Sequence, residues 1–141
     1  MLIENLITRS AATVCQNDTV ADAAQIMKDR DVGSVVVVED KKVVGILTDR
    51  DIVLRVGTDG HGSLEAPVSS VMTRMPLCLS ANVDVEQCLE RMEAHGVRRI
   101  PIVDDDDELI GVVSLDDILI HLGRVLGTAS ALVRAEVAGV V

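Results

Sequence analysis

Hydrophobic and polar positions follow the same pattern twice along the chain. A shift of 65 residues aligns residues 6–40 with the second half, and one extra residue in the acidic run 104–108 changes the shift to 66. Such internal self-similarity indicates that one structural unit is duplicated. The two repeats span residues 2–57 and 67–123, and a polar, glycine-rich linker at 58–66 joins them.

Each repeat predicts the element order β-α-β-β-α. Apolar residues spaced three and four apart predict a first helix, which is preceded by a short extended segment. Runs of Val, Ile and Leu separated by a polar turn predict a hairpin of two buried strands, and a second helix follows. For the first and second repeat, the ranges are an extended segment at 12–15 and 77–79, a first helix starting near 18–19 and near 82, a hairpin at 35–38 with 43–47 and at 100–103 with 109–113, and a second helix at 49–56 and 116–122.

The predicted fold class is therefore α/β (α+β), with two β-α-β-β-α repeats. A unit of about 55 residues has difficulty burying a core alone. We expect the repeats to pack their sheets together around a pseudo-twofold axis, leaving a cleft with two related sites. Apolar residues spaced three and four apart in residues 124–141 predict a C-terminal amphipathic helix, which either covers the pair of repeats or joins two chains.

A short motif, Gly-x-x-[Thr/Ser]-x-x-Asp, follows the second strand of each hairpin. The glycine admits the close approach of another backbone or of a ligand. The hydroxyl lies where strand turns into helix, a place that favours phosphate, and the aspartate one turn further can accept hydrogen bonds from a ribose diol. For either copy alone, the alternative is a capping box that only closes the start of the helix. The two copies are Gly45, Thr48 and Asp51, and Gly111, Ser114 and Asp117.

Composition and charge restrict the partners. The 23 acidic and 13 basic residues give a net charge of −10, which argues against a nucleic-acid surface. The chain has no Phe, Tyr or Trp, so aliphatic side chains would have to hold a base without ring stacking. We expect no signal peptide, no transmembrane helix and no membrane partner, and therefore a cytoplasmic location. Cys15, Cys78 and Cys88 form no paired motif and are expected to be free thiols.

Other polar features have ordinary explanations. The acidic run 104–108 lacks the glycine and the ligand alternation of a calcium loop, so it is expected to be a solvated hairpin turn. His61, His95 and His121 are far apart in the sequence, and no metal site is expected. The sequence contains no nucleophile elbow and no phosphate-binding P-loop, so we expect no catalytic residues and no enzymatic activity.

Over residues 2 to about 122 the chain resembles a tandem pair of CBS domains, also called a Bateman module. The resemblance rests on residues 18–27 with Val32-Gly33, on 43–52 and on 96–104. It is greatest to small stand-alone proteins that consist of little besides the pair. It implies a regulatory or sensor module that binds AMP, ADP, ATP or a related adenosine ligand between the repeats. Such a module signals by conformational change to a regulated partner, here unknown, and a homodimer is expected.

The resemblance also assigns roles to the motif residues. In nucleotide-binding members the motif aspartate holds the ribose hydroxyls, a role that carries over to Asp51 and Asp117. The hydroxyl residues Thr48 and Ser114 would support ribose or phosphate. No other cofactor is expected beyond the adenine nucleotide as a regulatory ligand.

Basic residues just before the middle strand contact phosphates in some members, and Arg98 and Arg99 match that place. The alternative is that both arginines pair with surface acids. The first repeat has Gly33 and Ser34 at this place, so the two sites are expected to be unequal. An aliphatic slot for adenine is predicted from four strand residues, namely Val35, Ile46, Ile100 and Val112.

Other functions fit the same sequence. The pair could be a structural dimerisation module whose cleft is vestigial, or a binder of S-adenosylmethionine, NAD or a divalent cation. Ligand binding to the native state raises thermal stability, whereas a vestigial cleft leaves it unchanged with every nucleotide. A cation sensor would instead have a melting temperature that responds to a chelator.

Overall fold

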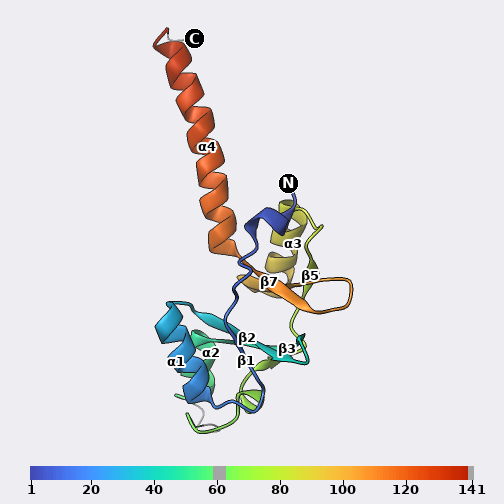
Figure 1. Cartoon of the computed structure of the whole chain (residues 1–141). Coiled ribbons are helices and arrows are strands. Elements are labelled where there is room, and N and C mark those ends of the chain that lie inside the picture. Colours follow the sequence, from blue (N-terminus) through green and yellow to red (C-terminus); the bar gives the residue numbers. More distant parts are fainter. Residues whose placement is uncertain (59–62, 140–141) are drawn as a thin grey trace.

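The computed structural model describes residues 1–58 and 63–139, which form two units, each with a small sheet and two helices (Figure 1). The fold is mixed α+β, and the predicted element order occurs in both units. Residues 59–62 of the predicted linker, which include His61, lie outside the described residues. The first unit contains β1 (Thr13–Val14), α1 (Val20–Arg30), β2 (Ser34–Glu39), β3 (Lys42–Thr48) and α2 (Asp49–Arg55), and the second contains β5 (Leu79–Ser80), α3 (Val85–His95), β6 (Arg99–Val103), β7 (Leu109–Ser114) and α4 (Leu115–Val137).

The two sheets share one arrangement. β1 pairs parallel with β2, which pairs antiparallel with β3, and β5, β6 and β7 repeat this order in the second unit. A register shift interrupts the first hairpin between Val37 and Val38 and the second between Ile102 and Val103. These positions are equivalent under the 65-residue shift, so the duplication extends to a single bulge.

Each repeat contributes its first residues to the other unit. β4 (Thr73–Arg74), near the start of the second repeat, pairs antiparallel with β3 of the first unit. Thr8 of the first repeat pairs with Val112 of β7 in the equivalent way. Figure 1 shows the N-terminal end of the chain beside α3. The predicted boundaries at 57 and 67 thus divide the sequence repeats, while the structural units exchange their N-terminal segments.

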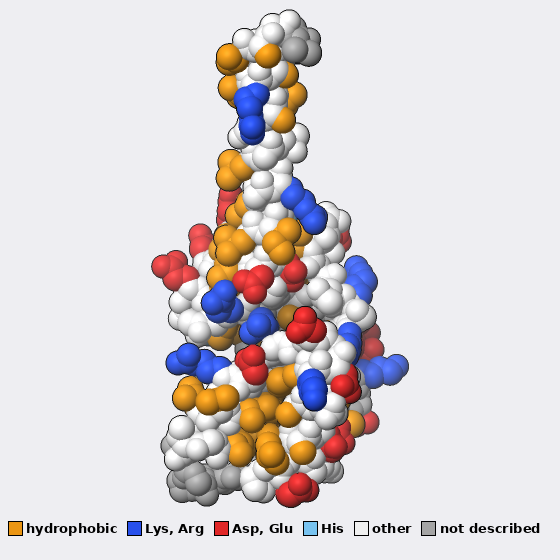
Figure 2. Space-filling model, turned by 90° about the vertical axis from the view of Figure 1, so that its left-hand side faces the viewer, with side chains coloured by type: hydrophobic (Ala, Val, Ile, Leu, Met, Phe, Trp, Pro, Cys, Tyr) orange, Lys and Arg blue, Asp and Glu red, His pale blue; other side chains and the backbone are white. Residues whose placement is uncertain are grey.

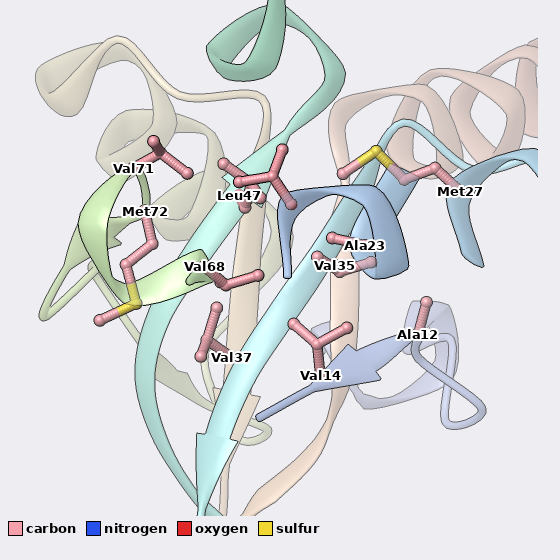
Figure 3. Close-up of a cluster of buried hydrophobic side chains, with 11 residues drawn as sticks. Ala12, Val14, Ala23, Met27, Val35, Val37, Leu47, Val68, Val71 and Met72 are labelled. Atoms are coloured by element: carbon pink, nitrogen blue, oxygen red, sulfur yellow. The ribbon is translucent and has the colours of Figure 1, made fainter. Parts of the chain in front are cut away.

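Each unit has its own aliphatic core, and the exchanged segments are part of both. In the first unit, Val68, Val71 and Met72 pack beside Leu47 and the valines of β2 (Figure 3). They belong to the segment that contains a short 3-10 helix, Val68–Ser70. In the second unit, Ile3 from the 3-10 helix Ile3–Leu6 is fully buried among residues of α3, β6 and β7. The exchange therefore ties the two units together through their cores.

The first helix of each unit begins with a capping box. Thr19 accepts a hydrogen bond from the Asp22 amide at 3.1 Å, and Asp84 accepts one from the Gln87 amide at 2.9 Å. The prediction near Asn82 was therefore wrong by two residues. The 65-residue shift itself places Thr19 on Asp84, and the intervening Val83 is held in an extended pairing by its carbonyl, which accepts from the Ile3 amide.

The second helix of the second unit and the C-terminal helix, predicted as separate elements, are the single helix α4. The predicted break at Gly123 was wrong because one glycine costs a helix only about 1 kcal/mol relative to alanine, and no proline stops the chain there. α4 projects away from both units (Figure 1), and its one buried residue is Ile118. It does not cover the pair of repeats. By length and composition α4 could also cross a membrane, which for a single helix is weak evidence.

Candidate functional site

Two cavities lie at the junction of the units, and we name them the Asp51 cavity and the Asp117 cavity after their motif aspartates. Their volumes are about 490 Å³ and about 310 Å³. Both are lined from both repeats, and the repeat shift converts one lining into the other. Equivalent members are Ile46, Thr48, Asp51, Thr73, Val97 and Arg99 in the Asp51 cavity, and Val112, Ser114, Asp117, Thr8, Val32 and Ser34 in the Asp117 cavity. The junction thus contains two related cavities, as the duplication predicts.

The first motif copy forms a capping box on the wall of the Asp51 cavity. Thr48 is the N-cap of α2; its Oγ1 accepts from the Asp51 amide at 3.0 Å, and Asp51 Oδ2 accepts from the Thr48 amide at 3.0 Å. Asp51 Oδ1 lies 3.4 Å from Arg55 Nη2. A carboxylate can accept about four hydrogen bonds. Capping therefore leaves Asp51 with acceptor capacity toward the cavity.

The second copy closes the start of α4 beside the Asp117 cavity. Ser114 Oγ accepts from the Asp117 amide at 3.1 Å and donates to Asp117 Oδ2 at 2.6 Å. Oδ2 also faces the Ser114 amide at 3.4 Å. This copy differs from the first because its carboxylate has no ion-pair partner among the residues that the structure describes. The capping alternative is therefore present in both copies, and both also border a cavity.

The motif glycines face the exchanged segments and not the cavities. A Cβ on Gly111 would lie 2.6 Å from the Thr8 carbonyl oxygen and would collide with Ile7. A Cβ on Gly45 would overlap the side chain of Met72 and lie 3.2 Å from the Thr73 carbonyl oxygen. Of the two predicted reasons for the glycine, the close approach of another backbone is the one observed.

Arg98 and Arg99 both line the Asp51 cavity, in different states. Arg98 pairs with Asp116 at 3.1 Å, and both side chains are largely exposed, so the pair contributes little to stability. Arg99 is half-buried, and its side chain has no hydrogen-bond or ion-pair partner within residues 1–58 and 63–139. The expected alternative of pairing with surface acids holds only for Arg98.

Arg99 also borders the Asp117 cavity. A Cβ on Gly33 would lie 2.9 Å from Arg99 Nη2 and 3.3 Å from Asp49 Oδ2. The Arg99 side chain therefore crosses from the second unit to the backbone of the first. Because the first repeat has Ser34 at the equivalent position, the two cavities share this arginine.

The two linings have opposite charge balance. The Asp51 cavity has three arginines against two aspartates, and the Asp117 cavity has two arginines against three aspartates. Part of the difference comes from one repeat position, which is Arg50 in the first repeat and Asp116 in the second. Figure 2 shows basic and acidic side chains gathered around the hollow between the units on one face of the molecule. The cavities are therefore unequal in size and charge.

Two of the four residues predicted for an adenine slot are misplaced. Ile46 and Val112 are half-buried and line the Asp51 and Asp117 cavities. Val35 and Ile100 are fully buried in the two cores, so their prediction as adenine-slot residues was wrong. Successive side chains on a strand point to opposite faces, so the cavity-facing position of β2 is the neighbouring Val36.

Sequence reasoning missed two basic groups near the ends of the first helices. Arg30 at the end of α1 lines the Asp117 cavity, and His95 at the end of α3 lines the Asp51 cavity. The 65-residue shift places these two residues at the same repeat position. This equivalent repeat position, considered together with the duplicated motif, is a signal in the sequence that could have identified Arg30 and His95 as cavity-lining residues.

The described residues place no cluster of metal-ligating side chains at these cavities. Within the described ranges, no group of three or more His, Cys, Asp and Glu side chains could hold a metal ion. The three cysteines are free. Burial raises the pKa of the Cys78 thiol, with a further contribution from Asp107, and burial raises the pKa of the Cys88 thiol. Raised thiol pKa values keep both sulfurs protonated near neutral pH.

Comparisons with known proteins identify relatives over nearly all of the chain. The CBS domain family model matches residues 3–57 and 68–124. The CBS domain-containing protein YhcV of Bacillus subtilis is 38% identical over 119 residues, which cover 84% of each chain.

Two solved structures have the same fold. The CBS-domain containing protein ATU1752 from Agrobacterium tumefaciens has a TM-score of 0.78 and 29% identity over 86% of this chain and 98% of that one. The CBS domain pair of protein MJ0100, solved with 5′-methylthioadenosine and S-adenosyl-L-methionine, has a TM-score of 0.79 and 22% identity over 87% and 96%. At 22% identity, the MJ0100 likeness concerns the fold alone.

Proposed function

The chain belongs to the CBS-domain family, with two domains in tandem, and we propose that it is a regulatory module that senses an adenosine-containing ligand such as AMP, ADP or ATP. The ligand bridges both repeats, favours one of their relative arrangements, and thereby alters recognition by a partner protein. In the MJ0100 pair the same fold was solved with 5′-methylthioadenosine and S-adenosyl-L-methionine, so the fold can accept ligands of this class. The module itself catalyses no reaction, acts in the cytoplasm and forms a homodimer.

The unpaired, half-buried guanidinium of Arg99 carries this proposal. Burying a charge without a partner is unfavourable, and Arg99 has no protein partner among the described residues. Arginine forks bind phosphate oxygens in pairs. A phosphate in the cavity would therefore supply the partner that the chain does not.

The Asp51 cavity is the proposed site for a phosphorylated ligand. It is the larger of the two and has more basic than acidic residues. Asp51 accepts from the ribose hydroxyls, Ile46 lies against the base, and Arg98 and Arg99 bind the phosphates. The exposed pair of Arg98 with Asp116 is weak enough to be exchanged for a phosphate contact.

The Asp117 cavity is the proposed site for an adenosine ligand with little or no negative charge. Its aspartates outnumber its arginines, and a second phosphate there would meet acidic side chains. Ser114 and Asp117 could still hold a ribose in the manner proposed for Thr48 and Asp51. This assigns ligands such as S-adenosylmethionine to the smaller cavity.

Isothermal titration calorimetry with ATP, AMP and adenosine tests the assignment. Arg99→Gln is expected to weaken ATP binding at least 10-fold and to leave adenosine binding nearly unchanged, because adenosine has no phosphate. Arg91→Gln is the matched control, since Arg91 is exposed on α3 and lines neither cavity. Absence of heat up to millimolar ATP, AMP, adenosine and S-adenosylmethionine would rule out the proposed function.

A further inference from the structure

The projecting part of α4 has a continuous apolar surface, the α4 stripe. Apolar residues recur every seven positions at three places on this helix, which is the pattern that lets two helices pack together. At its base the pattern includes Leu115 and Ile118, which pack on the second core. The exposed stripe consists of Leu119, Leu122, Val125, Leu126, Ala129, Leu132 and Val133.

Nothing in the described chain covers this stripe. Leu126, Leu132 and Val133 are 68%, 66% and 59% exposed. Figure 1 shows α4 extending beyond both units, and Figure 2 shows hydrophobic side chains along the projecting helix. Monomeric soluble proteins rarely expose an apolar surface of this extent. Helices in proteins also depend on packing of their apolar face for most of their stability. Gly123 and Gly127 lower the intrinsic stability of α4, so such packing is more necessary here.

We propose that the α4 stripe binds the α4 stripe of a second copy of this chain and so forms the homodimer of the proposed function. A specific interface buries about 800 Å² on each partner. The seven stripe residues, all of them exposed and spread over about four helical turns, supply the apolar centre of such a contact. The stripe is self-complementary, because each copy supplies the same seven-residue repeat to the other. Asp117, Arg124 and Arg134 lie on the side of α4 opposite the stripe, so these charges stay outside the contact. Asp116 flanks the stripe and pairs with Arg98, and Glu136 continues the seven-residue pattern only at the C-terminal end, beyond Val133.

A lipid bilayer is a poorer occupant of the same surface. Arg124 lies close to the middle of α4, where a spanning helix would hold it in the hydrocarbon core. Asp116 and Asp117 lie in the first turn. The net charge of −10 opposes adsorption to an anionic membrane surface. Pairing with a second copy requires none of these charges to leave water.

Sedimentation velocity of the full chain at micromolar concentration tests the proposal. Leu126→Asp places a charge in the stripe and is expected to halve the particle mass, with at least a 100-fold rise in the dissociation constant. Ile120→Asp is the matched control, because Ile120 is also exposed, at 55%, but lies on the opposite side of α4. It should keep the wild-type mass.

Leu132→Asp provides a second disruption, further from the folded units. Circular dichroism and ATP titration of each variant establish that the units remain folded, independently of the mass. Equal masses for wild type, Leu126→Asp and Leu132→Asp would overturn the proposal. So would a monomeric wild type that floats with vesicles of phosphatidylglycerol and phosphatidylcholine, because the membrane would then be the occupant.

Discussion

The motif aspartates have two roles at once. Asp51 closes the start of α2 through the Thr48 amide while bordering the cavity proposed for a nucleotide. From the sequence, capping and ligand binding are alternative interpretations of the motif, yet one carboxylate has acceptor sites for both. Loss of stability and loss of binding can therefore be separated only by a substitution that keeps the cap.

Asp51→Asn is expected to weaken ATP binding about 10-fold or more, because a hydrogen bond to a charged group contributes about 1.5–3 kcal/mol. Stability should change by less than about 1 kcal/mol, since the amide oxygen of asparagine can still accept from the Thr48 amide, as an N3 glutamine does in a capping box. Asp22→Asn is the matched control: Asp22 Oδ2 accepts from the Thr19 amide at 3.0 Å in the same geometry, away from both cavities. Equal ATP affinity in the two variants, by calorimetry, would contradict the ribose role of Asp51.

Single residues also mark the limit of sequence reasoning. The motif spacing located Thr48 and Ser114 on the cavity walls because it is tied to a strand end and a helix start. The prediction of Val35 and Ile100 as adenine-slot residues failed, because a run of similar apolar residues in a strand does not reveal which side chains face the core and which face the cavity. Comparing the two repeats does not correct this error, because the wrong face of the strand is chosen at equivalent positions in both repeats.

The order of the elements could be predicted, while the exchange of segments between units could not. Helix and strand patterns are local, and duplication allowed each half to check the other. The pairing of Thr8 with Val112 joins residues far apart in sequence and has no local signal. The motif glycines record this exchange, because only glycine admits the crossing backbone beside β7.

Ile3→Ala is expected to destabilise the chain by about 2–5 kcal/mol although Ile3 precedes the first predicted element, because it removes a fully buried side chain from the second core. The melting temperature should fall by roughly 6–20 °C. Leu2→Ala is the neighbouring control, with a side chain that is 40% exposed. A shift of about 2 °C corresponds to well under 1 kcal/mol of stability. If the melting temperatures of Ile3→Ala and Leu2→Ala differed by no more than about 2 °C, the exchanged segment would contribute little to the stability of the fold.

At the scale of the whole molecule, duplication has produced two cavities that share one positively charged side chain. Arg99 borders both, and its repeat equivalent is Ser34. A phosphate in either cavity would engage the same guanidinium, so a second phosphorylated ligand would find it already occupied. The two sites should therefore compete for charge even though their ribose-binding residues are duplicated.

Two ATP molecules are accordingly expected to bind with affinities that differ at least 10-fold, because the second meets an engaged Arg99 and an acidic lining. Adenosine makes no demand on Arg99, so its two affinities should lie much closer together. In Arg99→Gln the stronger ATP affinity should fall toward the weaker one, while Arg91→Gln keeps the wild-type ratio. Two-site calorimetric titrations measure all four cases. An ATP ratio that Arg99→Gln leaves unchanged would show that the inequality comes from the fixed aspartates of the Asp117 cavity and not from the shared arginine.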